Sequence, residues 1–106
     1  MNWRSLTNNE DINLQDYLRV WLEANPDHRI YIGCDSHNNA GKTTFATVIV
    51  LHHPNKGGHV LYNRSVVNRI QSRYEKLWKE VELSVEAAQI LMTAGIQSPD
   101  YIDIDL

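Results

Sequence analysis

The chain has 106 residues and a formal net charge of −3 at pH 7, and 42% of its residues are hydrophobic and 22% charged. These values are typical of one small globular domain. They exclude disordered and fibrous classes and a protein that binds nucleic acid by bulk positive charge alone. The single cysteine, Cys34, excludes an intramolecular disulfide framework. The sequence has neither an apolar export signal nor a run of about 18 apolar residues, so the expected location is the cytoplasm.

The first predicted element is an amphipathic helix from Asp11 to Asn25. Its apolar residues recur at spacings of three and four and would form one stripe. They are Ile12, Leu14, Tyr17, Leu18, Trp21 and Leu22. Asp11 is the expected N-cap, and Pro26 favours an end at Asn25 because the residue before a proline avoids the α region.

Three antiparallel strands are predicted next. The first covers Ile30 to Asp35 and is followed by a polar turn from Ser36 to Lys42. The second, Thr43 to Leu51, is nearly continuous in apolar and β-branched residues, which favours an interior strand covered on both faces. A turn at Pro54 to Gly58 leads to the third strand, His59 to Val67. Two short turns in succession indicate a β-meander.

A long helix and a fourth strand complete the predicted fold. The helix runs from Gln71 to Thr93, with Gly95 as its C-terminal stop. Its expected buried stripe is Leu77, Val81, Val85, Ala88, Leu91 and Met92. Tyr101 to Leu106 alternates between apolar and polar residues and predicts a strand. A crossover through the helix would place this strand parallel to the first, so we expect an α/β fold whose mixed sheet has the order 3-2-1-4.

Carboxylates mark two of the predicted strands. Asp35 ends the first strand, and Asp103 and Asp105 share one face of the fourth, so Asp35 and Asp105 could lie side by side. Two carboxylates about 5 Å apart repel by roughly 3 kcal/mol at an effective dielectric constant of about 20. A divalent cation would offset this repulsion, and oxygen ligands favour Mg²⁺ or Mn²⁺. Glu82 is a third candidate, expected on the shoulder of the helical stripe, whereas Glu80 is expected to point outward. The same spacing also fits surface carboxylates that bind no metal.

A locally basic segment lies between the third strand and the long helix. Its members are Arg64, Arg69, Arg73, Lys76 and Lys79. Such a segment suits the phosphate backbone of a nucleic acid. The alternative is a solvated loop and helix start with no ligand.

Three weaker patterns predict no site. Residues 41–43 (GKT) match the last three positions of the phosphate-binding P-loop pattern, but Ser36 occupies the position where that pattern requires its earlier glycine. Cys34 shares its strand face with Ile30 and Ile32, which indicates a structural cysteine rather than a nucleophile. The histidines at 52, 53 and 59 lack the spacing of a zinc site and are interpreted as surface residues.

Four segments together resemble a known family over nearly the whole chain. They are Ile30 to Ser36 (IYIGCDS), TFATVIVL, HPNKGGHV and KEVELSVEAAQIL. They are similar to the bacterial YkuK-type family of the ribonuclease H-like superfamily. The resemblance implies a ribonuclease H-like fold in which Asp35, Glu82 and Asp105 hold two divalent metals that cut a phosphodiester. Asp103 is a neighbour and a less favoured ligand.

The resemblance also implies a departure, because the superfamily fold continues past its fourth strand with a fifth strand and a helix that carries another acid. We therefore expect residues 1–106 to be a single domain that lacks the C-terminal part of the fold and is itself a poor nuclease. Association as a homodimer through the fourth strand's edge or the open sheet face is expected. The predicted function is a metal-dependent phosphodiester hydrolase acting on RNA or DNA. The alternative is a non-catalytic nucleic-acid-binding or protein-interaction module, and no membrane partner is expected.

Overall fold

A computed structural model describes residues 3–53 and 57–95, and the backbone of residues 102–105. The elements in chain order are β1 (Trp3–Ser5), β2 (Asp11–Ile12), α1 (Leu14–Ala24), β3 (Arg29–Asn39), β4 (Lys42–His53), β5 (Gly57–Asn68), α2 (Arg73–Thr93) and β6 (Ile102–Asp105). No helix among the described residues is long and apolar enough to cross a membrane.

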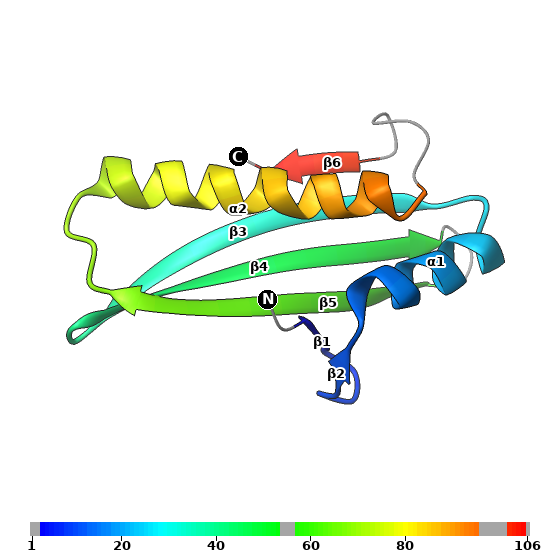
Figure 1. Ribbon diagram of the computed structural model, residues 1–106, viewed down its shortest axis with the longest axis horizontal. Coiled ribbons are helices and arrows are strands. Elements are labelled where there is room, and N and C mark those ends of the chain that lie inside the picture. Colours follow the sequence, from blue (N-terminus) through cyan, green and yellow to red (C-terminus); the bar gives the residue numbers. More distant parts are fainter. Residues whose placement is uncertain (1–2, 54–56, 96–101, 106) are drawn as a thin grey trace.

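The strands form one mixed sheet of order β2-β1-β5-β4-β3-β6 (Figure 1). Strands β3, β4 and β5 pair as an antiparallel meander, and β6 runs parallel to β3 with Asp105 opposite Gly33. The predicted order of the four main strands is confirmed, as is the α/β fold class. This order follows from the crossover through α2, which returns the chain to the free edge of β3.

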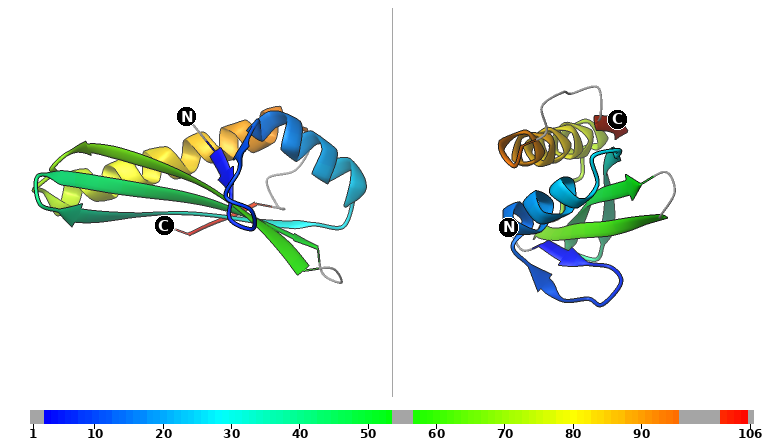
Figure 2. Two further views of the ribbon diagram at one scale, coloured as in Figure 1. Left: turned by 90° about the horizontal axis from the view of Figure 1, so that it is seen from below. Right: turned by 90° about the vertical axis from the view of Figure 1, so that its right-hand side faces the viewer.

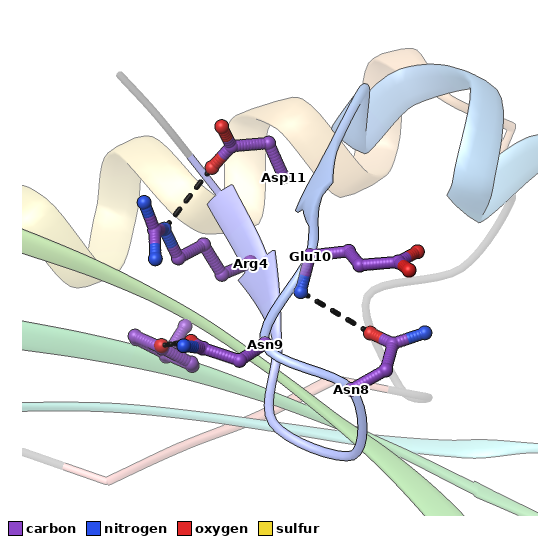
Figure 3. A network of polar contacts seen from close by, with 6 residues as sticks. Arg4, Asn8, Asn9, Glu10 and Asp11 are labelled. Atoms are coloured by element: carbon purple, nitrogen blue, oxygen red, sulfur yellow. Dashed lines mark hydrogen bonds and ion pairs between the residues drawn. The ribbon is translucent and has the colours of Figure 1, made fainter.

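The N-terminal hairpin was not predicted. The expected helix start at Asp11 is wrong, because Asp11 and Ile12 form β2 and pair with β1. Arg4 lies opposite Asp11 in this ladder, and their side chains form an ion pair of 3.0 Å (Figure 3). The N-cap of α1 is instead Asn13, whose side chain accepts a hydrogen bond of 3.1 Å from the Asp16 amide.

Both helices cover the same face of the sheet (Figure 2). The buried core lies between the sheet and these helices; it contains Trp3, Leu14, Leu18, Trp21, Ile30, Ile32, Ile49, Leu51, Leu61, Ala87 and Leu91. Along β4, fully buried residues alternate with half-buried ones. The prediction that β4 is covered on both faces is therefore wrong within the described residues, because no described helix packs on its second face.

Strand β3 is longer than predicted. It pairs with β4 as far as Asn39, which lies opposite Lys42, so only Ala40 and Gly41 remain at the hairpin tip. Ala40 adopts a φ of 54°, the left-handed conformation that a two-residue hairpin requires. The expected turn from Ser36 to Lys42 is wrong, because polar residues can form a strand when a partner strand satisfies their backbone groups. Asp35 consequently lies inside β3.

Helix α2 begins after its N-cap Ser72, whose hydroxyl accepts a hydrogen bond of 3.3 Å from the Glu75 amide. Its buried residues are Leu83, Ser84, Ala87 and Leu91. The expected stripe is wrong at Leu77, Val85 and Met92, which are exposed. Ser84 can be buried because its hydroxyl donates a hydrogen bond of 2.9 Å to the Glu80 carbonyl. This choice of face decides which acids of α2 approach the sheet.

Candidate functional site

Asp35 lies on β3 where the strand becomes polar. Alternation along β3 directs Cys34 and Ser36 toward the helices and Asp35 toward the open face. The Asp35 carboxylate is exposed, and its Oδ1 accepts a hydrogen bond of 2.9 Å from the Ser36 amide. Asp105 is paired with Gly33, two residues before Asp35, on the neighbouring strand. The register places the backbone of Asp105 two positions from the partner position of Asp35, and the proximity of the two carboxylates stays a prediction.

Glu80 is the acid of α2 that reaches β3. The Ser36 hydroxyl donates a hydrogen bond of 2.6 Å to Glu80 Oε2, and both residues are half-buried. Glu80 precedes Ser84, Ala87 and Leu91 by four, seven and eleven residues, so it shares the buried face of α2. Sequence reasoning missed this residue and its partner, although that spacing is a signal that could have found them.

Glu82 lies on the outer face of the helix. Two residues turn an α-helix by about 200°, so Glu82 points away from the sheet that Glu80 faces. Its exposed carboxylate forms an ion pair of 3.5 Å with Lys79. It also lines a shallow groove of about 680 Å³ together with Trp78 and Val81. The expected orientations of Glu80 and Glu82 are therefore the reverse of those in the structure.

Cys34 lies between the two acidic positions. Its half-buried thiol accepts a hydrogen bond of 3.5 Å from the Thr47 hydroxyl. Burial raises the pKa of the Cys34 thiol, the negative charges of Glu80 and Asp35 raise this pKa further, and the Thr47 hydrogen bond opposes them. Asp35 acts on this thiol as its neighbour in the chain, whereas Glu80 acts on it from the helix that covers this face of the sheet.

The described side chains alone do not form a complete metal centre. Within residues 3–53 and 57–95, no group of three or more His, Cys, Asp or Glu residues surrounds a common point. The side chains of Asp103 and Asp105 lie outside the described residues; the backbone of Asp103 is paired with Tyr31. The described candidates are Asp35, on the open face of β3, and Glu80, on the face that the helices cover.

A pocket of about 510 Å³ lies at the Ser36–Glu80 contact. Its lining comprises Ser36, Arg73, Tyr74, Lys76, Leu77 and Glu80. Two members of the basic segment, Arg73 and Lys76, therefore lie next to the Ser36–Glu80 contact. Their cationic groups and the carboxylate of Glu80 give the pocket both signs of charge.

The other basic residues lie elsewhere. Arg69 donates a hydrogen bond of 2.7 Å to the Ala40 carbonyl at the hairpin tip, and Lys79 pairs with Glu82. Arg64 is exposed on β5, where Ala46 is its partner in β4. The basic segment is therefore divided among several surfaces, and only its helical start borders the candidate site.

A buried hydrogen-bond network holds the start of α2 over the β3–β4 hairpin. The fully buried hydroxyl of Thr43 donates to Asn38 Oδ1 at 2.6 Å and accepts from the Ile70 amide at 2.9 Å. The Asn38 side-chain amide donates to the Ile70 carbonyl at 3.2 Å. Because Ile70 lies two residues before the N-cap, this network positions the first turns of α2 beside β3.

The mixed sheet and the crossover helix α2 form one α/β domain that carries acids on β3 and α2. The sequence model of the ribonuclease H-like family matches residues 14–105, and the chain belongs to this family. A comparison with curated proteins finds no match, and a comparison with solved structures finds none.

Proposed function

We propose that this protein is a metal-dependent phosphodiester hydrolase of the YkuK type that acts on nucleic acid. The observation that carries the proposal is the Ser36–Glu80 hydrogen bond, which holds a helical carboxylate against the strand that bears Asp35. Membership of the ribonuclease H-like family supports the reaction class. The register of β6 supports Asp105 as the third acid.

The donor atoms of the site fit Mg²⁺ or Mn²⁺. Both cations prefer carboxylate oxygens, and Asp35 and Glu80 each present two. One oxygen of each accepts a protein hydrogen bond, which orients the carboxylate. Because Asp35 lies on the open face of β3 and Glu80 on the helix-covered face, binding of one ion by both would require the Asp35 side chain to turn toward α2. Asp105 would complete the set, with Asp103 as a neighbour. Two bound ions would supply an activated water and stabilisation of the leaving oxygen.

The chain's own residues would orient the carboxylates and hold the substrate. Ser36 restrains Glu80 through its hydroxyl, so the carboxylate does not have to be ordered when a ligand arrives. Arg73 and Lys76 line the same pocket and would bind phosphate oxygens of the nucleic-acid backbone. These cations equally favour the second candidate function, a nucleic-acid-binding module without hydrolysis.

Metal binding can be tested without activity. We expect Mn²⁺ to raise the melting temperature of the wild-type chain, and Asp35→Asn or Glu80→Gln to remove this increase. Glu82→Gln is the matched control, because it neutralises an acid of the same helix that faces away from β3. Loss of the metal effect in Glu82→Gln but not in Glu80→Gln would return the helical ligand to Glu82. Absence of any effect in the wild-type chain would contradict the metal site.

Hydrolysis requires a separate assay. Labelled RNA, DNA and RNA–DNA hybrids are incubated with the wild-type chain and with Asp35→Asn in Mg²⁺ or Mn²⁺, with EDTA as the metal-free control. We expect cleavage by the wild-type chain only in the presence of metal. Cleavage equal to that of Asp35→Asn would contradict the hydrolase, and retained binding of nucleic acid would then support the non-catalytic module.

A further inference from the structure

The first two turns of α2 expose both of their aromatic side chains. Tyr74 is 74% exposed and Trp78 is 65% exposed. The other two tryptophans of the chain, Trp3 and Trp21, are only 3% and 8% exposed and belong to the core. An exposed tryptophan beside an exposed tyrosine is unusual, because each leaves a large apolar area in contact with water. The pair therefore marks a binding surface.

Tyr74 and Trp78 lie four residues apart, so they occupy the same face of the helix. Together with Ile70 they line a pocket of about 350 Å³, bordered by the side chains of Glu75 and Lys79. Tyr74 also lines the pocket that contains Ser36 and Glu80. The aromatic surface is consequently continuous with the candidate carboxylate site.

Three basic side chains share pockets with these rings: Arg73 and Lys76 with Tyr74, and Lys79 with both Tyr74 and Trp78. Residues 69–79 include four basic side chains and one acidic one, a net charge of +3, whereas the whole chain carries −3. The basic residues are Arg69, Arg73, Lys76 and Lys79. Exposed aromatic rings set among basic residues are typical of surfaces that bind single-stranded nucleic acid, where bases stack on the rings and phosphates contact the cations.

We propose that Tyr74 and Trp78 form a stacking platform for the bases of single-stranded nucleic acid and lead the strand to the adjoining pocket of Ser36 and Glu80. The second part of this inference rests on the proposed function, whereas the platform itself does not. Four helical residues span about 6 Å, close to the roughly 7 Å covered by two base steps. Duplex nucleic acid buries the faces of its bases and would not stack on these rings.

A nucleic acid fits this surface better than a protein partner does. Protein interfaces are enriched in aromatic residues but depleted of lysine, and Lys76 and Lys79 line the same pockets as these rings. A second copy of the chain would also bring the same positive charges face to face. A protein partner is therefore the alternative that the experiment must exclude.

The fluorescence of Trp78 provides a selective test. Because the other tryptophans are buried, stacking of a base should quench mainly the emission of Trp78. The wild-type chain is titrated in EDTA with a ten-nucleotide oligo-uridine, an oligo-thymidine and a duplex of the same length, and affinity is measured by anisotropy of labelled strands. We expect quenching and binding by the single strands, and weaker binding by the duplex.

Substitutions test whether the rings of Tyr74 and Trp78 bind the single strand. Trp78→Ala and Tyr74→Ala should each weaken single-strand binding at least about fivefold, whereas Trp78→Phe should preserve most of it. Met92→Ala is the matched control, because Met92 is a large exposed apolar residue at the other end of the same helix. Equal affinities for the wild-type chain, Tyr74→Ala and Trp78→Ala would overturn the platform.

The design separates failure of the platform from failure of the hydrolase. EDTA removes metal-dependent chemistry, so binding is scored independently of cleavage. Binding that depends on Trp78, without cleavage in metal, would support the platform and contradict the hydrolase. Cleavage with no effect of Tyr74→Ala or Trp78→Ala on affinity would support the hydrolase and contradict the platform. If single strands do not quench Trp78, the platform is overturned; self-association that Trp78→Ala abolishes would then identify a protein interface.

Discussion

The hydroxyl of Ser36 donates a hydrogen bond of 2.6 Å to the carboxylate of Glu80 and so joins β3 to α2. The two residues are 44 positions apart in the chain. In the orientation that α2 adopts about its axis, Glu80 faces the sheet and Glu82 faces solvent. The acid of α2 that contacts β3 is thereby chosen by packing of the helix rather than by its local sequence.

We expect Ser36→Ala to lower the free energy of unfolding by about 1–2 kcal/mol, because it removes a half-buried hydrogen bond to a carboxylate. Urea unfolding of Ser36→Ala, Glu80→Gln and the double variant measures the coupling between the two side chains. Glu82→Gln serves as the control and should change stability by less than about 0.5 kcal/mol, since its partner Lys79 is at the surface. Strictly additive effects of the first two substitutions would contradict a direct Ser36–Glu80 interaction.

Thr43→Val should destabilise the fold by about 2–3 kcal/mol. The substitution keeps the shape of the side chain but leaves Asn38 Oδ1 and the Ile70 amide without their buried partner. Thr47→Val is a matched substitution on the same face of β4, and its cost should be smaller because the lost bond goes to the weakly accepting sulfur of Cys34. Chemical denaturation compares the two. A larger loss for Thr47→Val would show that the Thr43 network does not hold the hairpin to α2.

Gly58→Ala should lower stability by about 1–3 kcal/mol, because the added Cβ would lie only 2.8 Å from the Leu51 carbonyl oxygen in the neighbouring strand. Gly33→Ala makes the same chemical change where, among the described residues other than its chain neighbours, no heavy atom lies within 4 Å of the new Cβ. It should leave the melting temperature unchanged or slightly higher, since alanine loses less backbone entropy in a strand. Equal effects of the two substitutions in thermal unfolding would refute the close approach at Gly58.

The thiol of Cys34 should be alkylated with a pH midpoint above that of an ordinary cysteine, because burial and the nearby charges of Glu80 and Asp35 raise its pKa. Glu80→Gln and Asp35→Asn each remove a negative charge and should lower the midpoint. Thr47→Val removes the opposing hydrogen bond and should raise it. Rates of alkylation measured across pH in EDTA supply these midpoints, and a midpoint in Glu80→Gln at or above the wild-type value would contradict the arrangement.

The raised pKa of Cys34 also determines how the free energy of unfolding changes with pH. A thiol with a raised pKa in the folded protein favours its protonated form, so its contribution is fully present below the unfolded pKa of about 8.5. This contribution is lost as the pH rises through the pKa of the folded protein. The free energy of unfolding should therefore fall above about pH 8.5, and Cys34→Ala should reduce that fall.

The sequence by itself determined the meander, the crossover helix and the order of the four main strands. Alternation of apolar residues marks β3 and β6 because a strand has a side-chain period of two. Turn residues separate the strands, and the handedness of the crossover leaves one simple place for the last strand. The position of Asp35 on β3 was predicted in this way, and its role as a metal ligand stays a prediction. Association of the chain as a homodimer also stays a prediction.

Only the tertiary structure decided where β3 ends and which face of α2 meets the sheet. Polar residues after Asp35 look like a turn until β4 pairs with them. Helix α2 bears apolar residues on both sides, with Trp78 and Val85 on one and Leu83 and Leu91 on the other. Its periodicity therefore permits either face to be buried. Contacts distant in sequence resolve that choice, because the energy of burying a face depends on what lies opposite it.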